Sequence, residues 1–319
     1  MRIGLIGFGR IGQRHAETLR GLEAVESLVV ADADPSRARA VAGRLGLGVA
    51  ENIDDLLAER PDGVVIAAPT PTHAELVRRV AAAGVPIFCE KPLASDIAGT
   101  REVLAVVEAA GVSLQLGFQR RFDPDFIAAK QQLEAGKLGR LHSILACTLD
   151  PAPPPPAYIP TSGGLFRDCS VHDIDAIRWA TGRRIVEAVA VGANLGERFF
   201  AEAGDVDTAH AILTLDDGVL ATIVASRYNG GGYEGRLELH GSLATATAGL
   251  EGAREVSYVG FADRFAQAYA AELRAFTRLV SGQGDNLCPG KDALEALYVA
   301  EACELSRREH RPVRLEEVS

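Results

Sequence analysis

The first part of the chain alternates short apolar runs with segments that have the apolar spacing of helices. The runs predict strands at Arg2–Phe8, Ser27–Ala31, Gly63–Ala68, Pro86–Cys89 and Ser113–Gly117. The segments between them predict helices at Gln13–Leu22, Ser36–Leu45, Ile53–Glu59 and Thr70–Ala83. Strands that alternate with helices are typical of a parallel sheet, so we expect an α/β domain over residues 1–119.

The second part has a different rhythm, in which apolar and polar residues alternate within the runs. These runs predict strands at Val186–Ala193, Asp207–Leu215, Leu220–Arg227 and Gly235–His240. Asp216-Asp217-Gly218 has the composition of a hairpin turn, and the glycine-rich Asn229–Gly232 predicts a loop or bulge. We therefore expect a second domain, residues 120–319, built on an antiparallel sheet.

Composition narrows the class of protein. The 319 residues are 47% hydrophobic and 24% charged, which is ordinary usage for a globular protein of two domains. The net charge of −10 argues against a nucleic-acid partner, and no apolar stretch approaches the length that spans a bilayer. The five cysteines show no CxxC pair, which fits a reducing compartment and predicts a cytoplasmic protein. No cluster has metal-ligand spacing, so we expect no metal.

The first predicted strand runs into Gly7-Phe8-Gly9-Arg10-Ile11-Gly12, a GxGxxG motif that stands between a strand and a helix. Its glycines allow a tight turn, a close approach of the backbone to a pyrophosphate, and close packing of helix on strand. Asp32 ends the second predicted strand, where an acid should meet the adenosine ribose of a Rossmann dinucleotide site. Its carboxylate favours NAD over NADP, because it would repel a 2′-phosphate. Arg37 is either a partner for such a phosphate or a solvated charge on the next helix.

Lys91 is the candidate for chemistry in the first domain. It lies in Glu90-Lys91-Pro92 directly after a predicted strand, and ligands of an open α/β sheet bind outside the carboxyl ends of its strands. Pro92 keeps the residue before it extended, which presents the lysine in one direction. Beside a positively charged nicotinamide, the lysine either becomes neutral and shares in taking a proton or stays charged and polarises a carbonyl. We expect further cofactor contacts from Pro69, Thr70, His73 and Glu90.

The segment Gly163–Asp175, GGLFRDCSVHDID, predicts a helix that carries an acid and an imidazole one turn apart. Asp168 and His172 would share one face of this helix, and such a pair can orient a hydroxyl and take its proton. We therefore expect His172 to act as a general base. Gly182 is a natural end for the helix, and we interpret Cys169 as a small buried apolar residue. The other histidines have no acidic residue in such a position beside them and are expected to be structural. His73 is also a candidate to flank the nicotinamide.

Two more segments stand near this helix in the sequence. Six prolines lie in Pro151–Pro160 and predict extended, semi-rigid backbone, either a wall over the substrate or a spacer. Arg120 and Arg121 follow the last predicted strand of the first domain, and adjacent arginines can bind a carboxylate or a phosphate. Because Asp123 and Asp125 lie close by, we expect ion pairs between the domains, with Arg120 also a candidate for the substrate site.

Together, these motifs resemble the glucose-fructose oxidoreductase / inositol dehydrogenase / MocA (Gfo/Idh/MocA) family. The resemblance spans most of the chain and rests on GFGRIG, PTPTHAEL at residues 69–76, Glu90-Lys91-Pro92 and GGLFRDCSVHDID. The segments Gly117–Asp123 and Asp150–Gly164 are narrower signals and are similar to those of myo-inositol 2-dehydrogenases.

The resemblance implies a Rossmann NAD(P)-binding domain followed by an open, mostly antiparallel sheet domain, assembled into dimers or tetramers through the sheet. It implies that Lys91, Asp168 and His172 are the catalytic residues. It also implies that Tyr233 lines a polyol site, although Gly235 stands where the motif usually has glutamine.

These parts lead to one hypothesis, the NAD-dependent oxidation of a cyclic polyol, first of all myo-inositol to 2-keto-myo-inositol (scyllo-inosose). Asp168 and Lys91 would hydrogen-bond its hydroxyls, His172 would remove a proton, and hydride would pass to the nicotinamide. Epimers differ only in where each hydroxyl points, so another inositol, an aldose or an amino sugar stays open as the substrate. A regulator that senses NAD(P) without turnover is the alternative of another class, and it would not need the three residues.

Overall fold

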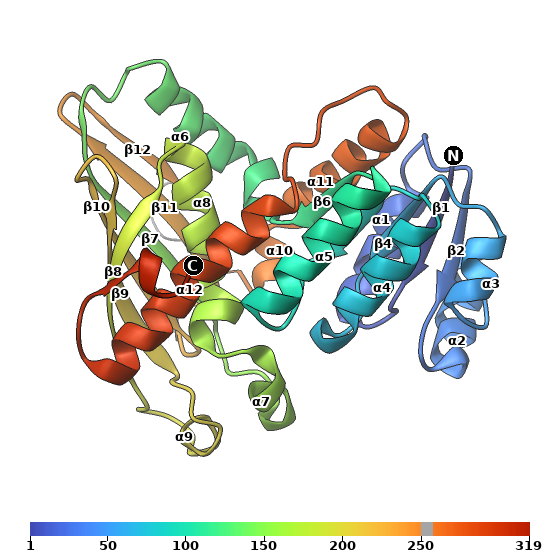
Figure 1. Ribbon diagram of the computed structural model, residues 1–319, viewed down its shortest axis with the longest axis horizontal. Helices are drawn as coiled ribbons and strands as arrows, with labels where there is room; N and C mark the ends of the chain where they lie inside the picture. The colour runs from blue at the N-terminus through green and yellow to red at the C-terminus, as the bar shows by residue number, and fades with distance from the viewer. Residues whose placement is uncertain (250–257) are drawn as a thin grey trace. The chain divides into compact units, whose positions relative to one another are not determined.

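The computed structural model describes residues 1–249 and 258–319, and the chain divides into two units (Figure 1). The first unit consists of residues 1–119 and 267–294, and the second consists of residues 120–266 and 295–319. The sequence predicted a first domain of residues 1–119 alone, whereas the first unit also contains residues 267–294. Residues 267–294 return to it because they carry apolar side chains, Leu273 and Phe276, that are fully buried in the core of the first unit.

The first unit is built on a sheet of six strands in the order β3-β2-β1-β4-β5-β6. Every pair of neighbouring strands is parallel. The strands are β1 Arg2–Ile6, β2 Ser27–Ala31, β3 Gly48–Val49, β4 Gly63–Ile66, β5 Ile87–Glu90 and β6 Leu114–Gly117. The central strand β4 is buried at every residue, as continuous apolar runs require when helices cover both faces of a parallel sheet. The predicted α/β architecture is confirmed.

Helices follow the strands of this sheet in the predicted rhythm. They are α1 Arg10–Arg20, α2 Pro35–Leu45, α3 Ile53–Ala58, α4 Thr70–Ala82 and α5 Ile97–Ala110, joined late in the chain by α11 Ala266–Val280. Helices α4 and α5 lie side by side (Figure 1). Helix α11 packs against β5 through two aromatic rings, those of Phe276 and Phe88, whose centroids are 5.9 Å apart. The sequence did not predict α5 or α11.

The second unit is built on a sheet of seven strands in the order β12-β11-β7-β10-β9-β8-β13. All neighbours are antiparallel except β7 and β10, which are parallel. The strands are β7 Leu141–Leu149, β8 Ile185–Ala193, β9 Thr208–Leu215, β10 Leu220–Ser226, β11 Glu234–Gly241, β12 Thr245–Ala248 and β13 Val313–Arg314. Strands β8 to β11 match the predicted strands closely. The predicted hairpin joins β9 to β10, with Gly218 at φ +86°.

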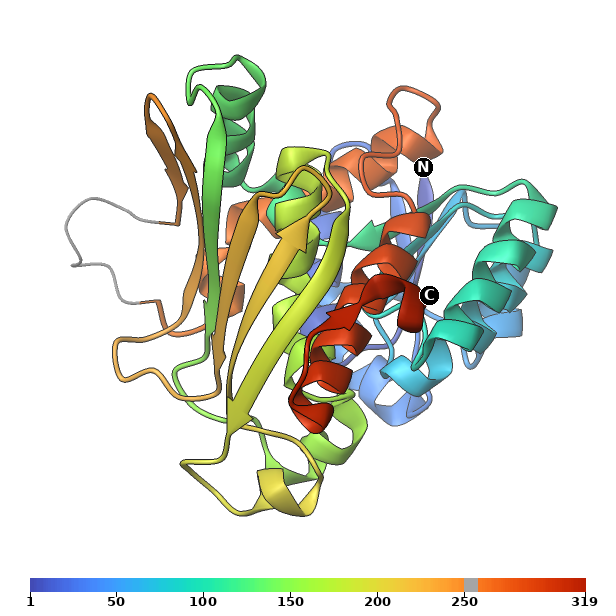
Figure 2. The same ribbon diagram turned by 60° about the vertical axis from the view of Figure 1, so that its left-hand side comes forward.

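One face of this second sheet is covered by helices. Helices α6 Pro124–Glu134 and α8 Val171–Thr181 pack on β7, β11 and β12 (Figure 2). The opposite face presents apolar side chains to solvent, such as the register neighbours Val189 and Ile212, which are 37% and 50% exposed. The remaining helices are α7 Ile159–Ser162, α9 Phe199–Glu202, α10 Phe261–Arg264 and α12 Lys291–Glu309.

Two local predictions were wrong. The segment predicted as one helix over Gly163–Asp175 contains a π-helix, Phe166–Ser170, and α8 begins only at Val171. A π-turn closes over one residue more than an α-turn, so the four-residue spacing of Asp168 and His172 does not align their side chains as in a regular helix. The segment Pro151–Pro160 is not extended throughout. It ends in a 3₁₀ turn and in α7, because the first turn of a helix tolerates proline.

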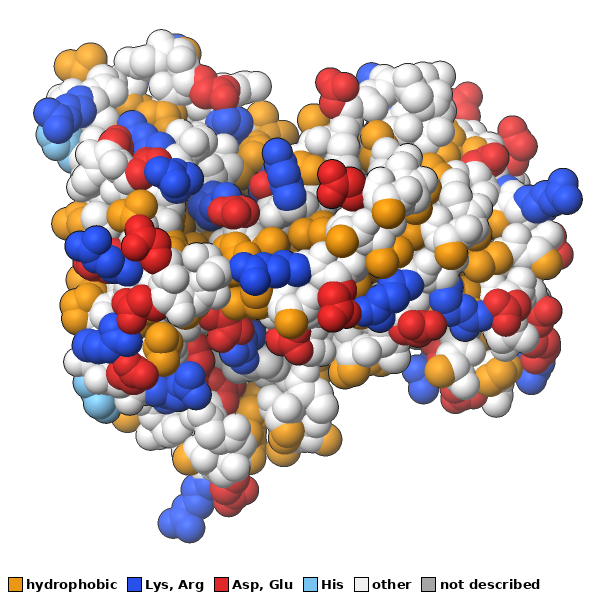
Figure 3. All heavy atoms as spheres, in the orientation of Figure 1, with side chains coloured by type: hydrophobic (Ala, Val, Ile, Leu, Met, Phe, Trp, Pro, Cys, Tyr) orange, Lys and Arg blue, Asp and Glu red, His pale blue; other side chains and the backbone are white. Residues whose placement is uncertain are grey.

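Charged side chains of both signs are interspersed on the face shown in Figure 3. Several form exposed ion pairs, for example Arg78 with Glu102, whose N and O atoms are 3.0 Å apart. Such pairs contribute about 0–1 kcal/mol each to stability, so the fold depends on its cores rather than on its surface charges. Among the residues that the structure describes, none of the helices has the length and hydrophobicity that a membrane span needs.

Candidate active site

The loop between β1 and α1 has glycine where its geometry requires it. Gly7 has a φ of +93°, and a Cβ on it would lie 2.5 Å from the backbone nitrogen of Ala68. A Cβ on Gly12 would lie 1.9 Å from the carbonyl oxygen of Gly7. A Cβ on Gly9 would meet open space, and no side chain within the described chain caps the N-terminus of α1. The N-terminus of a helix presents backbone N–H groups that suit the pyrophosphate of a dinucleotide.

Asp32 follows β2 and is tied to this loop. Its Oδ2 accepts a hydrogen bond from the backbone N–H of Phe8 at 2.6 Å, and its Oδ1 accepts one from Asp34 at 2.8 Å. Arg37 of α2 is half exposed, with its Nη1 3.8 Å from Asp32 Oδ1. The carboxylate predicted to bind the ribose is therefore fixed beside the glycine loop.

The Glu90-Lys91-Pro92 segment stands at the carboxyl end of β5, where Lys91 is half-buried. His73, at the start of α4, is fully buried and holds the backbone here. Its Nδ1 lies 2.7 Å from the carbonyl oxygen of Pro92, and its Nε2 lies 2.7 Å from that of Ala68. Both ring nitrogens are thus engaged by backbone, and His73 links the chain after β4 to the chain after β5. The sequence also gave this imidazole as a candidate to flank the nicotinamide, and that role stays a prediction.

In the second unit, the carboxylate of Asp168 is held on both oxygens. Its Oδ2 accepts a hydrogen bond from Arg227 Nη2 at 2.7 Å, and its Oδ1 accepts one from the Tyr158 hydroxyl at 2.9 Å. Arg227 also donates to Asp150 Oδ2 at 3.2 Å and lies 2.9 Å from the sulfur of Cys169. We call these five residues the Arg227 cluster. The guanidinium is only 4% exposed, so it balances two carboxylates in a nearly dry setting.

The environment of the Arg227 cluster sets the charge of its members. Burial opposes the charge of Arg227, but the sulfur of Cys169 and the carboxylate of Asp168 outweigh it and raise the pKa of the guanidinium. Burial raises the pKa of Asp150, and Arg227 opposes that rise. Desolvation of its hydroxyl and the charge of Asp168 raise the pKa of Tyr158. The hydroxyl of Tyr158 therefore stays protonated and donates a hydrogen bond to Asp168. Cys169 is buried as predicted, but it contacts a cation rather than a purely apolar wall.

His172 is the second residue of α8 and is half-buried. Two arginines fix the helix beneath it. Arg120 donates to Asp173 Oδ1 at 2.5 Å, and Arg121 donates to both oxygens of Asp175 at 2.6 and 2.9 Å. The partners that both arginines bind on α8 belong to the second unit. The ion pairs expected between the domains stay a prediction. Both arginines bind α8, and this anchoring sets the direction in which the helix presents His172.

Two family models match the chain. Residues 1–118 match the model of an oxidoreductase family with an NAD-binding Rossmann fold, and residues 126–247 match the Gfo/Idh/MocA C-terminal domain. The chain belongs to the Gfo/Idh/MocA family. It is therefore an oxidoreductase, and its first unit is an NAD-binding domain whose glycine loop and Asp32 fit the cofactor.

Several relatives with similar sequences are named inositol dehydrogenases. The chain is 38% identical to an inositol 2-dehydrogenase of Rhizobium meliloti over 98% of both chains. It is 36% identical to a myo-inositol 2-dehydrogenase of Thermotoga maritima, over 100% of this chain and 99% of the other. Among solved structures, it is similar to a scyllo-inositol dehydrogenase from Lactobacillus casei with bound NAD(H) and scyllo-inositol. That likeness has a TM-score of 0.91 at 29% identity and covers 99% of each chain.

The surroundings of Tyr233 explain one departure from the Gfo/Idh/MocA motif. Tyr233 is buried, and its ring packs edge-on against Phe261 and Phe265 at 6.3 and 6.2 Å between centroids. Gly235 stands where the motif usually has glutamine. A Cβ on Gly235 would lie 3.0 Å from Phe265 and 3.4 Å from the guanidinium of Arg120. A longer side chain has no room there, because Arg120 and Phe265 fill the space.

Sequence reasoning missed the residues that hold Asp168. Arg227 lies 59 residues from Asp168 at the end of a strand, and nothing in its own neighbourhood of the sequence indicates its partner. Tyr158 had a weak signal, because it stands ten residues before Asp168 in the proline-rich segment. The proline-rich segment was interpreted as a wall or a spacer, whereas in this structure it brings a hydroxyl to the acid.

Proposed function

We propose that this Gfo/Idh/MocA protein oxidises an inositol with NAD and that myo-inositol is its substrate. The observation that carries the proposal is the likeness over nearly the whole chain to inositol 2-dehydrogenases. Retention of Lys91, Asp168 and His172 supports it, because a protein that only senses NAD has no use for an acid, an imidazole and an amine at these positions.

The proposal gives each of the three side chains a task. NAD, when bound, accepts the hydride that leaves the carbinol carbon. His172 takes the proton from the reacting hydroxyl through an imidazole nitrogen. Asp168 stays anionic beside Arg227 and accepts a hydrogen bond from a substrate hydroxyl, since each carboxylate oxygen keeps a further lone pair. Lys91 donates to the oxygen on which negative charge develops. We also propose Arg120 and Tyr233 as residues of the substrate pocket.

We further propose that the protein forms a homo-oligomer, a dimer or tetramer, through the uncovered face of the second sheet. Val189 and Ile212 are neighbours in register on this face, and Val191 beside them is 60% exposed. A patch of exposed aliphatic side chains on a flat sheet is typical of a protein–protein interface. In light scattering, the double variant Val189→Glu, Ile212→Glu should have a lower mass. Leu243→Glu, an exposed loop position, should keep the mass of the wild type.

We place the protein in the cytoplasm. All five cysteines are buried and lie outside disulfide bonds, as expected in a reducing compartment.

The decisive experiment follows nicotinamide absorbance with NAD or NADP and a panel of inositol epimers and pyranoses. We expect turnover of myo-inositol with NAD. Lys91→Met and His172→Asn should each lower kcat by about 100-fold or more, as the loss of a proton-transfer group does. Lys137→Met and His142→Asn change the same residue types at exposed positions and should leave kcat unchanged.

Other outcomes would redirect the proposal. Turnover of another epimer or of a pyranose would keep the mechanism and replace the substrate. Tight NAD binding without oxidation of any polyol would overturn the inositol proposal and favour a sensor. Equal losses in the control variants would show that the assay reports stability rather than chemistry.

A further inference from the structure

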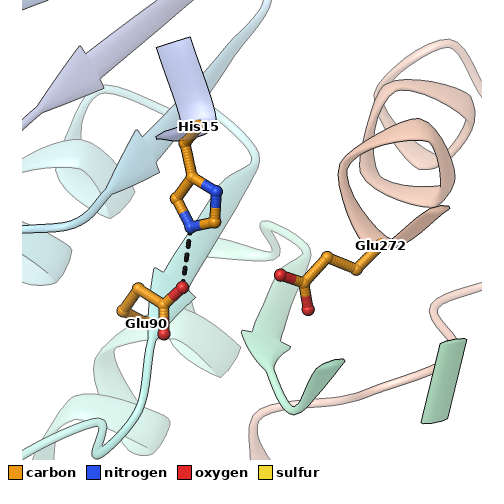
Figure 4. Close-up of side chains that lie close together, drawn as sticks. All are labelled: His15, Glu90 and Glu272. Carbon is orange, nitrogen blue, oxygen red and sulfur yellow. Dashed lines mark hydrogen bonds and ion pairs between the residues drawn. The ribbon is translucent and has the colours of Figure 1, made fainter. Parts of the chain in front are cut away.

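Three titratable side chains meet inside the first unit. They are His15 of α1, Glu90 at the end of β5 and Glu272 of α11 (Figure 4). His15 Nε2 lies 2.7 Å from Glu90 Oε1, and the carboxyl group of Glu272 faces this pair. One nitrogen or oxygen atom from each of the three side chains lies within 4.8 Å of the other two. His15 and Glu272 are 0% exposed, and the side chain of Glu90 is 14% exposed. We call these three residues the acid cluster.

Glu272 has the least favourable position in the acid cluster. Among the described residues, neither of its carboxyl oxygens has a hydrogen-bond partner. An ionised carboxylate here would be a buried charge that faces another carboxylate, and both conditions are costly. Burial, together with the charge of Glu90, raises the pKa of Glu272 well above its usual value. A neutral acid removes the buried charge and supplies an O–H that one bridging water can connect to Glu90.

Glu90 is held from other sides as well. It pairs in register with Gly117 of β6, and a Cβ on Gly117 would lie 2.9 Å from Glu90 Oε2. The neighbouring strand therefore needs glycine to admit this carboxyl group. His15 binds the other oxygen. Glu90 is the last residue of β5 and directly precedes Lys91, so a fixed Glu90 also fixes the point at which the backbone of Lys91 leaves the strand.

We propose that Glu272 is a positioning residue. Its carboxyl group stays protonated and donates a hydrogen bond toward Glu90, so that the acid cluster orients Lys91. The inference rests on the proposed role of Lys91. A divalent cation on the same three side chains would require Glu272 to be ionised, and the experiments separate this outcome from the proposed one.

The protonation state is tested without substrate, by infrared difference spectroscopy of the wild type and Glu272→Gln at neutral pH. We expect the variant to lose the C=O stretch of a protonated carboxyl group. Glu108→Gln, at an exposed position of α5, is the matched control and should lose only carboxylate bands. Loss of carboxylate bands in Glu272→Gln would overturn the proposal. One equivalent of a divalent metal in the purified wild type, absent from Glu272→Gln, would also overturn it.

The positioning role is tested by kinetics. Glutamine keeps a donor toward Glu90, so Glu272→Gln should keep kcat within about twofold, whereas Glu272→Leu should lower it about 10- to 100-fold, as a misplaced reacting group does. The Kd for NAD should be unchanged in both variants. Equal activity of the two variants would overturn the role.

A second variant replaces Glu272→Leu in the kinetic test if that protein does not fold. If Glu272→Leu does not fold, Gly117→Ala is used, because its Cβ crowds Glu90 Oε2 and should lower kcat without weakening NAD binding. Unchanged kcat in Gly117→Ala would overturn the role. If the wild type oxidises no polyol, the proposed function fails, while the infrared result still decides the state of Glu272.

Discussion

The Arg227 cluster of the second unit and the acid cluster of the first unit both contain buried carboxyl groups. The two clusters differ in how these groups are stabilised. In the Arg227 cluster, two carboxylates share one guanidinium, and Asp168 has a hydrogen bond on each oxygen. In the acid cluster, two carboxyl groups meet one imidazole, and among the described residues neither carboxyl oxygen of Glu272 has a hydrogen-bond partner. A buried carboxylate keeps its charge where a cation is hydrogen-bonded to it and keeps its proton where none is.

This difference matches the tasks proposed for the two clusters. Asp168 has to present an anion to a substrate hydroxyl, so a permanent cation behind it is useful. Glu90 has to hold still beside Lys91, so a neutral donor next to it avoids repulsion between two carboxylates. The comparison therefore predicts different responses to the loss of one member of each cluster.

Loss of the cation from the Arg227 cluster should have the largest effect. Arg227→Met removes the cation that is hydrogen-bonded to Asp150 and Asp168, which should lower the free energy of unfolding by about 3–5 kcal/mol. Urea denaturation measures this change. Arg140→Met, at an exposed position, should be within about 0.5 kcal/mol of the wild type.

A triple variant tests whether charge is the cause. When Asp150→Asn and Asp168→Asn are added to Arg227→Met, most of the lost stability should return, because the two carboxylates that Arg227 neutralised are then absent. If the triple variant is less stable than Arg227→Met, packing rather than charge explains the loss.

A pH-dependent effect should follow at the acid cluster. The pKa of Glu272 is raised in the folded protein, so the folded state binds its proton more tightly than the unfolded state does. This contribution to stability is complete below about pH 4.5 and decreases as the pH rises toward the folded pKa, by about 1.4 kcal/mol per pH unit. Glu272→Gln does not titrate at this position, so its stability relative to the wild type should increase with pH.

Urea denaturation of both proteins between about pH 5 and pH 7 measures this relative stability. The titratable groups of the acid cluster besides Glu272, which are His15 and Glu90, are present in both proteins, so the difference in stability reports mainly on Glu272. A difference that is constant with pH would mean that Glu272 is ionised in the folded protein, and the contrast between the clusters would disappear.

The smallest effect is expected from the hydroxyl that binds Asp168. Tyr158→Phe removes one hydrogen bond at a partly exposed ring and should cost about 0.5–1 kcal/mol of stability. It should lower kcat more than it changes the Kd for NAD, because one oxygen of Asp168 is then free to turn. Tyr228→Phe removes a hydroxyl that accepts a 3.2 Å hydrogen bond from the backbone of Glu197 and should leave kcat unchanged.

The sequence predicted the parts of the fold that depend on local patterns. The apolar runs predicted five of the six strands of the first sheet, all but β3, and four strands of the second. Glycine spacing predicted the nucleotide loop with Asp32. Strand β7 was missed because its apolar run includes polar and small residues, His142 and Ser143 among them. The π-helix was missed because periodicity assumes regular turns, whereas the irregular turn is fixed by contacts of Asp168 with distant residues.

The partners of the candidate catalytic residues could not be predicted. Arg227 meets Asp168 only after the second sheet forms, and Glu272 meets Glu90 only after α11 packs on the first unit. Each pairing joins residues far apart in sequence, and a single chain carries no local signal for it. His15 was interpreted as structural, and its 2.7 Å contact with Glu90 depends on the same long-range packing.

The return of residues 267–294 to the first unit has a consequence for the order of synthesis. A ribosome makes the chain from the N-terminus, and domains generally fold as units as they emerge. The NAD-binding unit begins first, yet it lacks Leu273, Phe276 and Glu272 until nearly the whole chain has been made. A fragment cut at residue 119 would expose the surface that these residues cover. Any attempt to isolate the cofactor domain should therefore join residues 1–119 to residues 267–294 through a new linker.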